Sequence, residues 1–154
     1  MRHLIIMRHG KAEPGENKPD YERMLGPRGW QEAESVAAQL AAAGLAPDTV
    51  LCSASRRTRD TFSAMLPHIG GDCVVHMRTS LYEAETTDLK EAMRRAEGQR
   101  VLLIGHNPSV HALSLNFAGA NGDRIGSSFP TSTAAVFAMG FALDTVKFDR
   151  LLTP

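Results

Sequence analysis

The sequence predicts an α/β protein, a three-layer α/β/α sandwich built around a mainly parallel central sheet. Short apolar runs alternate with segments of helical periodicity along the whole chain, which is the pattern of a parallel sheet with crossover helices. No repeat, low-complexity tract or linker interrupts this alternation. The chain has 154 residues, 43% of them hydrophobic, which suffices for one full core. We therefore expect residues 1–154 to form a single domain.

The first part of the chain predicts a strand, a long loop and a helix. Residues 4–7 form a short continuous apolar run, as expected of a parallel strand covered on both faces. Residues 11–26 are polar and interrupted by prolines, which indicates a surface loop of a length that is often functional. Apolar residues then recur at helical spacing over residues 30–41, between Pro27 in the first turn and Gly44 at the end.

The middle of the chain continues the alternation. Residues 49–52 predict the second strand, residues 56–66 a helix that ends before Pro67, and residues 74–76 a short third strand. Residues 88–96 predict the third helix, with Asp88 and Glu91 at the spacing of a capping box.

The last part predicts three more strands and one more helix. Residues 101–104 are apolar throughout and predict a buried strand. Asn107 and Pro108 are expected to be the N-cap and the first residue of the helix that follows. Residues 134–139 and 145–151 predict the two final strands.

Charge and composition exclude several classes of protein. Seventeen Lys and Arg balance 17 Asp and Glu, which argues against a nucleic-acid partner or an anionic membrane surface. No run approaches the roughly 18 apolar residues of a membrane span, and the N-terminal apolar run is too short for a signal peptide. Cys52 and Cys73 are too few for a disulfide scaffold. We expect a cytoplasmic protein.

Chemically unusual residues follow three of the expected strands. Arg8, His9 and Gly10 follow the first, Arg57 follows the second, and His106 follows the fourth. Ligands of α/β sheets bind at the carboxyl ends of the strands, so these side chains should meet at one edge. Arginine can grip two phosphate oxygens at once, and a helix N-terminus favours an anion. A histidine or arginine alone is usually structural or solvated, but the conjunction predicts a site for a tetrahedral dianion.

Other catalytic arrangements fit the spacing less well. Cys52 is followed by Thr58 where a cysteine phosphatase needs arginine to close its phosphate loop. The sequence contains neither a Gly-x-Ser-x-Gly elbow nor a Walker phosphate loop. The histidines lack the spacing of metal ligands, and the adjoining arginines would repel a cation. We expect neither a metal nor another cofactor.

Three motifs, in order along the chain, resemble those of the histidine phosphatase superfamily, which includes the cofactor-dependent phosphoglycerate mutases. They are Arg8-His9-Gly10, the series Ser53, Arg57 and Thr61 at four-residue spacing, and Gly105-His106. The short length, the segment from Arg23 to Gly29, and Phe129-Pro130-Thr131 are similar to the SixA-like phosphohistidine phosphatases. The resemblance implies a phosphoglycerate mutase-like fold.

The resemblance also implies roles for the strand-end residues. His9 would attack phosphorus and form a phosphohistidine intermediate that water cleaves, and no metal is implied. Arg8, Arg57 and His106 would hold the phosphoryl oxygens and stabilise charge in the transition state. Glu83 would donate a proton to the leaving group.

Some roles are less closely defined. Glu85 competes with Glu83 for the role of proton donor, and a solvated loop carboxylate is the alternative for Glu83. If Glu83 is the acid, burial near Leu81 and Tyr82 should raise its pKa. Lys11 and Arg23 either border the pocket or are plain surface charges.

The expected function is a metal-independent phosphatase for phosphohistidine on a partner protein, acting as a monomer. Two alternatives stay open: a phosphatase for a small phosphate ester, and an inactive module that only binds phosphate.

Overall fold

The computed structural model describes residues 1–140 and 145–154, and its central feature is a six-stranded sheet in the order β3-β2-β4-β1-β5-β6. The strands are β1 Arg2–Arg8, β2 Thr49–Ser53, β3 Val74–Arg78, β4 Arg100–Gly105, β5 Ala134–Met139 and β6 Lys147–Leu152. β3, β2, β4 and β1 are parallel, whereas β5 and β6 are each antiparallel to the preceding strand in the sheet. The predicted mainly parallel sheet is therefore confirmed.

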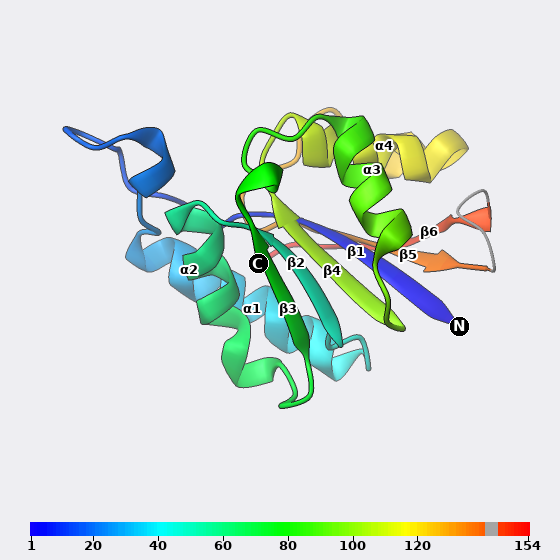
Figure 1. Ribbon diagram of the computed structural model, residues 1–154. Coiled ribbons are helices and arrows are strands. Elements are labelled where there is room, and N and C mark those ends of the chain that lie inside the picture. Colours follow the sequence, from blue (N-terminus) through cyan, green and yellow to red (C-terminus); the bar gives the residue numbers. More distant parts are fainter. Residues whose placement is uncertain (141–144) are drawn as a thin grey trace.

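The α-helices of the described residues pack in pairs on the two faces of the sheet (Figure 1). They are α1 Pro27–Ala42, α2 Arg56–Met65, α3 Thr86–Arg95 and α4 Ser109–Ala118. Leu4 and Ile6 of β1 point into the core beneath α3 and α4. Ile5 and Met7 point into the opposite core, beneath α1 and α2. Because alternate residues of a strand face opposite ways, an apolar run must be covered on both sides, and the three-layer prediction is confirmed.

The edge strand β3 is longer than predicted and is largely exposed. It runs two residues beyond the predicted 74–76, and most of its side chains are exposed, with Val74 at 54%. β3 has only β2 as a neighbour, which explains why its apolar residues are not enclosed.

The predicted start of the third helix is wrong. α3 begins at Thr86, and its capping box joins Glu85 to Asp88 rather than Asp88 to Glu91. The Asp88 carboxylate accepts a hydrogen bond of 3.0 Å from the Glu85 backbone N–H. Glu91 instead pairs with Arg94 and Arg95 on the exposed side of the helix.

The predicted cap of the fourth helix is also wrong. α4 begins at Ser109, and the Asn107 side chain makes no cap hydrogen bond. Its amide donates to the Phe129 carbonyl at 2.9 Å, and the peptide bond between Asn107 and Pro108 is cis. The amide is therefore used to tie the end of β4 to the segment before β5.

The polar segment between β1 and α1 is the expected long loop, and it projects beyond α2 in Figure 1. Its two ends are paired where Ala12 bridges to Leu25. A short 3-10 turn, Asp20–Glu22, lies in its middle. The Asp60 carboxylate of α2 accepts the Leu25 backbone N–H at 3.1 Å. These contacts hold the loop against the carboxyl ends of the strands.

No helix in the described part of the chain is long and apolar enough to cross a membrane.

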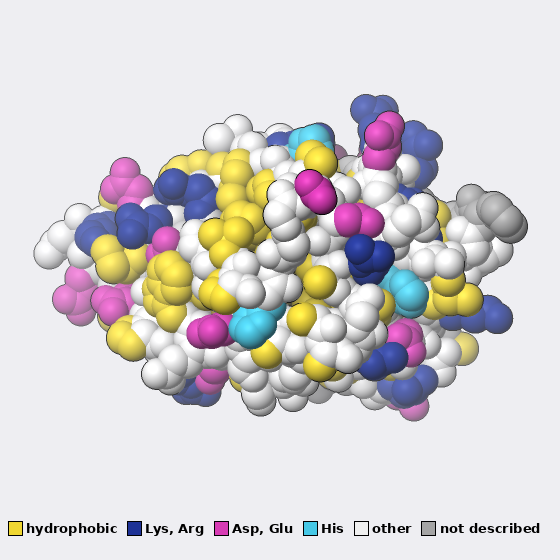
Figure 2. Space-filling view, turned by 90° about the horizontal axis from the view of Figure 1, so that it is seen from below, with side chains coloured by type: hydrophobic (Ala, Val, Ile, Leu, Met, Phe, Trp, Pro, Cys, Tyr) yellow, Lys and Arg dark blue, Asp and Glu magenta, His cyan; other side chains and the backbone are white. Residues whose placement is uncertain are grey.

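The last expected strand, 145–151, is found as β6 Lys147–Leu152. On the face shown in Figure 2, Lys and Arg are interspersed with Asp and Glu, so neither sign of charge dominates there.

Candidate active site

The turn after β1 is fixed by backbone contacts on three sides. The His9 N–H donates to the Gly105 carbonyl at the end of β4, at 3.1 Å. The Gly10 N–H donates to the Thr61 hydroxyl of α2 at 2.9 Å. A Cβ on Gly10 would lie 2.9 Å from the Gly29 carbonyl, so any larger residue would push β1 and α1 apart. The sequence therefore places His9 in one position relative to β4 and α2.

His9 is buried, and its ring is held in one tautomer. Nδ1 lies 2.7 Å from the Gly10 carbonyl, which can only accept, so Nδ1 carries the proton. Burial lowers the pKa of His9 to about 3, and the charges of His106, Arg57 and Arg8 act in the same direction. The ring is therefore neutral at physiological pH, with a free electron pair on Nε2.

His106 lies beside His9, with the two ring centroids 5.4 Å apart. Its Nε2 is 2.8 Å from the Ser53 hydroxyl at the end of β2. Its buried Nδ1 has no hydrogen-bond partner in the described residues. Burial, followed by the charge of Arg57, lowers the pKa of His106 to about 4. If Ser53 donates to Nε2, the Nδ1–H is left to donate to a bound ligand.

Two arginines complete the cationic lining. Arg8 donates to the Phe129 carbonyl at 3.2 Å, while Arg57 stands in the first turn of α2. Burial lowers the pKa of Arg8, and the neighbouring charge of Arg57 lowers it further. The Nε atoms of both arginines are buried, and the described residues offer them no partner. Because the two like charges repel each other, an anion that binds both arginines is favoured.

A cavity of about 220 Å³ joins these groups into one site. Its lining consists of Arg8, His9, Lys11, Ala12, Arg23, Arg57, His106, Asn107 and Thr131. The structure thus brings together the four residues expected to bind and transfer a phosphoryl group. It also places Lys11 and Arg23 at the border of the cavity.

Glu83 lies apart from this group. It is exposed, as the alternative of a solvated loop carboxylate requires, and the burial expected of an acid is not found. Glu83 lines a separate cavity of about 500 Å³ with Glu85. That cavity also includes Pro108, the residue after Asn107, so the two cavities are neighbours along the chain. The role of Glu83 as proton donor stays a prediction.

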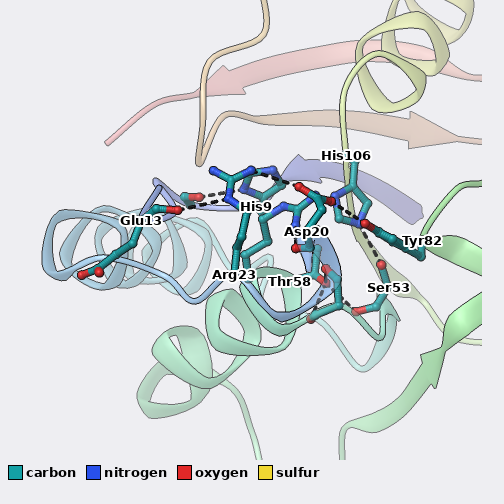
Figure 3. A network of polar contacts seen from close by, with 11 residues as sticks. His9, Glu13, Asp20, Arg23, Ser53, Thr58, Tyr82 and His106 are labelled. Carbon is teal, nitrogen blue, oxygen red and sulfur yellow. Dashed lines mark hydrogen bonds and ion pairs between the residues drawn. The ribbon is translucent and has the colours of Figure 1, made fainter. Parts of the chain in front are cut away.

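Asp20 is a site residue that sequence reasoning missed. It reaches the site from the loop before α1 and contacts Arg57, Arg23 and Tyr82 (Figure 3). The loop has no periodicity that would reveal this placement, because it depends on how the whole segment folds back. Ser53, whose hydroxyl contacts His106 Nε2, belongs to the second of the three sequence motifs, but the sequence predicts no role for it.

The described residues contain no group of three His, Cys, Asp or Glu side chains arranged to hold a metal ion. The site is instead lined by arginines, neutral imidazoles and the Asn107 side chain. These groups are suited to holding an oxyanion.

Comparison with known proteins identifies the family of this chain. The sequence pattern of the histidine phosphatase superfamily (branch 1) matches residues 4–91. The uncharacterized protein Rv1276c of Mycobacterium tuberculosis is 36% identical over 139 residues, which are 84% of this chain and 85% of that protein.

Solved structures extend the similarity to the fold. A candidate phosphohistidine phosphatase SixA from Agrobacterium tumefaciens has a TM-score of 0.87 and 29% identity, covering 99% of this chain and 98% of that one. The protein histidine phosphatase SixA complexed with tungstate has a TM-score of 0.82 at 21% identity, covering 98% of this chain and 96% of that one. The second similarity shows the fold alone.

Proposed function

The chain is a phosphatase of the histidine phosphatase superfamily, and we propose that it hydrolyses phosphohistidine on a partner protein. The observation that carries the proposal is the free Nε2 of the neutral His9 ring in a cavity lined by Arg8, Arg57 and His106. A nucleophile and several oxyanion-binding groups are thereby combined at one edge of the sheet.

The reaction would proceed in two displacements at phosphorus. In the first, His9 Nε2 attacks, the bond from phosphorus to the leaving group breaks, and the phosphoryl group is held on His9. In the second, water attacks the same phosphorus and releases inorganic phosphate and the free ring. The hydrogen bond from Nδ1 to Gly10 keeps the ring oriented and accommodates the charge that develops on it.

The surrounding groups would stabilise the transferring phosphoryl group. Arg8 and Arg57 carry positive charge, and His106 offers an N–H from Nδ1 if the Ser53 hydroxyl donates to its Nε2. Charge stabilisation by groups already in position supplies most of the catalysis in phosphoryl transfer. Because Arg8 is held by the Phe129 carbonyl and His106 by the Ser53 hydroxyl, these two groups need little reorganisation when the substrate arrives.

The small cavity favours a protein substrate over an enclosed metabolite. Its volume of about 220 Å³ is below the roughly 300–1,000 Å³ of pockets that enclose small molecules. It accommodates a phosphoryl group and leaves the rest of the substrate outside. The SixA similarity points to phosphohistidine as the group presented there.

Glu83 is the proposed proton donor for ester substrates, acting from the neighbouring cavity. An alkoxide leaving group needs a proton, whereas a phosphorylated imidazole can leave with less help. Glu83→Gln should therefore slow hydrolysis of a phosphoserine peptide more than that of a phosphohistidine peptide, measured as kcat. Equal losses on both peptides would contradict an acid role.

The proposed function is tested by phosphate release, in the presence of EDTA, from phosphohistidine and phosphoserine peptides of otherwise identical sequence. Preferential release from phosphohistidine would support the proposal. Preferential release from phosphoserine would favour an esterase. Release from neither peptide would contradict both a phosphohistidine phosphatase and an esterase acting on such peptides.

A further inference from the structure

Asp20 engages the outer side of the Arg57 guanidinium. Arg57 Nη1 donates to the Asp20 backbone carbonyl at 2.8 Å, and Nη2 donates to the carboxylate at 3.0 Å. The same carboxylate oxygen accepts the Tyr82 hydroxyl, while the other accepts Arg23 Nη1 at 3.1 Å. Both oxygens are therefore held, and the carboxylate has a defined position.

This contact places a negative charge beside the phosphate cavity, on its solvent side or mouth, because the Asp20 side chain is 52% exposed and donors that line the cavity hold it. Arg57 and Arg23 line that cavity, and both donate to Asp20. The Tyr82 ring packs edge-on to His106 with centroids 5.5 Å apart, which brings the carboxylate's hydrogen-bond partner against the catalytic ring (Figure 3). The Tyr82 hydrogen bond, supported by the arginines, holds the pKa of Asp20 well below its usual range. Asp20 is thus anionic.

A carboxylate beside the cavity weakens the binding of a phosphate dianion taken alone. The carboxylate repels the incoming phosphoryl oxygens and competes with them for the Nη groups of Arg57. Its presence is favourable only if another part of the substrate is cationic. The leaving group is the part that lies at the mouth, because the phosphoryl group lies within and faces His9.

We propose that Asp20 selects substrates whose leaving group carries positive charge, and so favours an N-phosphorylated imidazole over a phosphate ester. The inference rests on the proposed function and adds the residue that determines the preference. In such a substrate the ring nitrogen that is not phosphorylated carries a proton, and Asp20 pairs with that charge. A serine phosphate has an uncharged leaving oxygen and meets only the repulsion.

The chemistry of the first displacement is balanced without an added proton donor. His9 Nε2 forms the new bond to phosphorus while the bond from phosphorus to nitrogen breaks. The electron pair of the broken bond goes to the leaving nitrogen. Because the other ring nitrogen already carries a proton, the imidazole leaves as a neutral molecule.

The test compares wild type with Asp20→Asn and with Glu22→Gln. Glu22 is exposed on the same 3-10 turn, so its variant removes one charge from the turn without altering the Arg57 contact. The ratio of kcat/KM for phosphohistidine and phosphoserine peptides of the same sequence is measured for each protein. We expect the ratio to fall about tenfold in Asp20→Asn, as for loss of one charge pair near a protein surface, and to be unchanged in Glu22→Gln.

The affinity for inorganic phosphate separates selection from simple support of Arg57. If the carboxylate repels anions, Asp20→Asn should bind phosphate more tightly, measured as competitive inhibition or by calorimetry. If Asp20 only holds Arg57 in place, the variant should bind phosphate more weakly and lose activity equally on both peptides, which would overturn the inference.

The remaining outcomes are also decisive. A wild-type protein that cleaves both peptides, with an unchanged ratio in Asp20→Asn, would overturn the inference and leave the phosphatase assignment intact. A wild-type protein that cleaves neither peptide would overturn the proposed function and this inference with it.

Discussion

At the scale of single residues, two neutral histidines of similar burial are set up for different tasks by one hydrogen bond each. His9 donates from Nδ1 to Gly10, which exposes a lone pair on Nε2. His106 has its Nε2 against Ser53, so its Nδ1 carries the proton and can donate when the Ser53 hydroxyl donates to Nε2. The strand-end pattern of the sequence predicted both residues. The tautomers could not be predicted, because they depend on a backbone carbonyl and a hydroxyl brought in by the fold.

Arg57→Ala should weaken the binding of vanadate about 10- to 100-fold, because charge-assisted hydrogen bonds contribute roughly 1.5–3 kcal/mol. The affinity is measured by competitive inhibition or calorimetry. Arg59→Ala is the matched control, since Arg59 is exposed on the same helix and donates to the Ala54 carbonyl outside the cavity. Unchanged affinity in Arg57→Ala would remove this residue from the phosphate site.

At the scale of elements, the start of α2 joins three parts of the site. Thr61 accepts the Gly10 N–H and donates to the Arg57 carbonyl at 2.7 Å. Thr58 donates to the Ser53 carbonyl at 2.6 Å, and Asp60 holds the end of the loop through Leu25. The helix therefore fixes the positions of the turn after β1, the end of β2 and the loop that carries Asp20.

Thr61→Val should lower both stability and turnover, because the buried Gly10 N–H loses its acceptor. The expected loss is about 1–3 kcal/mol in the free energy of unfolding, measured by urea denaturation. Thr61→Ser keeps the hydroxyl and should retain most of the activity. Equal stability of the valine and serine variants would show that the hydrogen bond does not hold the turn.

The order and type of the elements were predictable, and so were the starts of α1 and α2, whereas the starts of α3 and α4 were not. Strands β1, β2, β4 and β5 follow from continuous apolar runs, since both faces of the sheet are covered. The start of α3 was misplaced because Glu85–Asp88 and Asp88–Glu91 have the same capping-box spacing. Either start leaves Leu89 and Met93 on the buried side, so the apolar pattern cannot distinguish them.

At the scale of the whole molecule, burying two histidines makes the fold sensitive to acid. The pKa values of His9 and His106 are about 3 and about 4 in the folded protein, against roughly 6.5 in the unfolded chain. Below pH 6.5 the unfolded chain binds more protons, so stability falls as the pH decreases until the folded pKa is reached. At pH 5 each histidine should cost about 2 kcal/mol of stability.

Between pH 7 and pH 5, the free energy of unfolding of His9→Gln should therefore fall by about 2 kcal/mol less than that of wild type. The comparison uses urea denaturation at both pH values, with His106→Gln as a second variant. Carboxylates contribute equally to wild type and variant, so the difference isolates the histidine. A wild type and a variant with the same pH dependence would contradict burial of a neutral ring.

The path of the long loop is the part of the molecule that the sequence could not reveal. Residues 11–26 are expected to lie on the surface, and most of them do, but they also fold back so that Asp20 reaches Arg57 at the start of α2. The same carboxylate also accepts the hydroxyl of Tyr82, which is far away in the sequence. Local patterns carry no signal for such pairs.

The most direct test of the account is to look for a phosphoryl group on His9 itself. The protein is mixed with a phosphohistidine peptide, quenched within milliseconds under alkaline conditions that preserve phosphohistidine, digested and analysed by mass spectrometry. We predict a phosphoryl group on the peptide that contains His9, and neither adduct nor turnover in His9→Gln. Turnover in His9→Gln, or a phosphoryl group on another residue, would contradict His9 as the nucleophile.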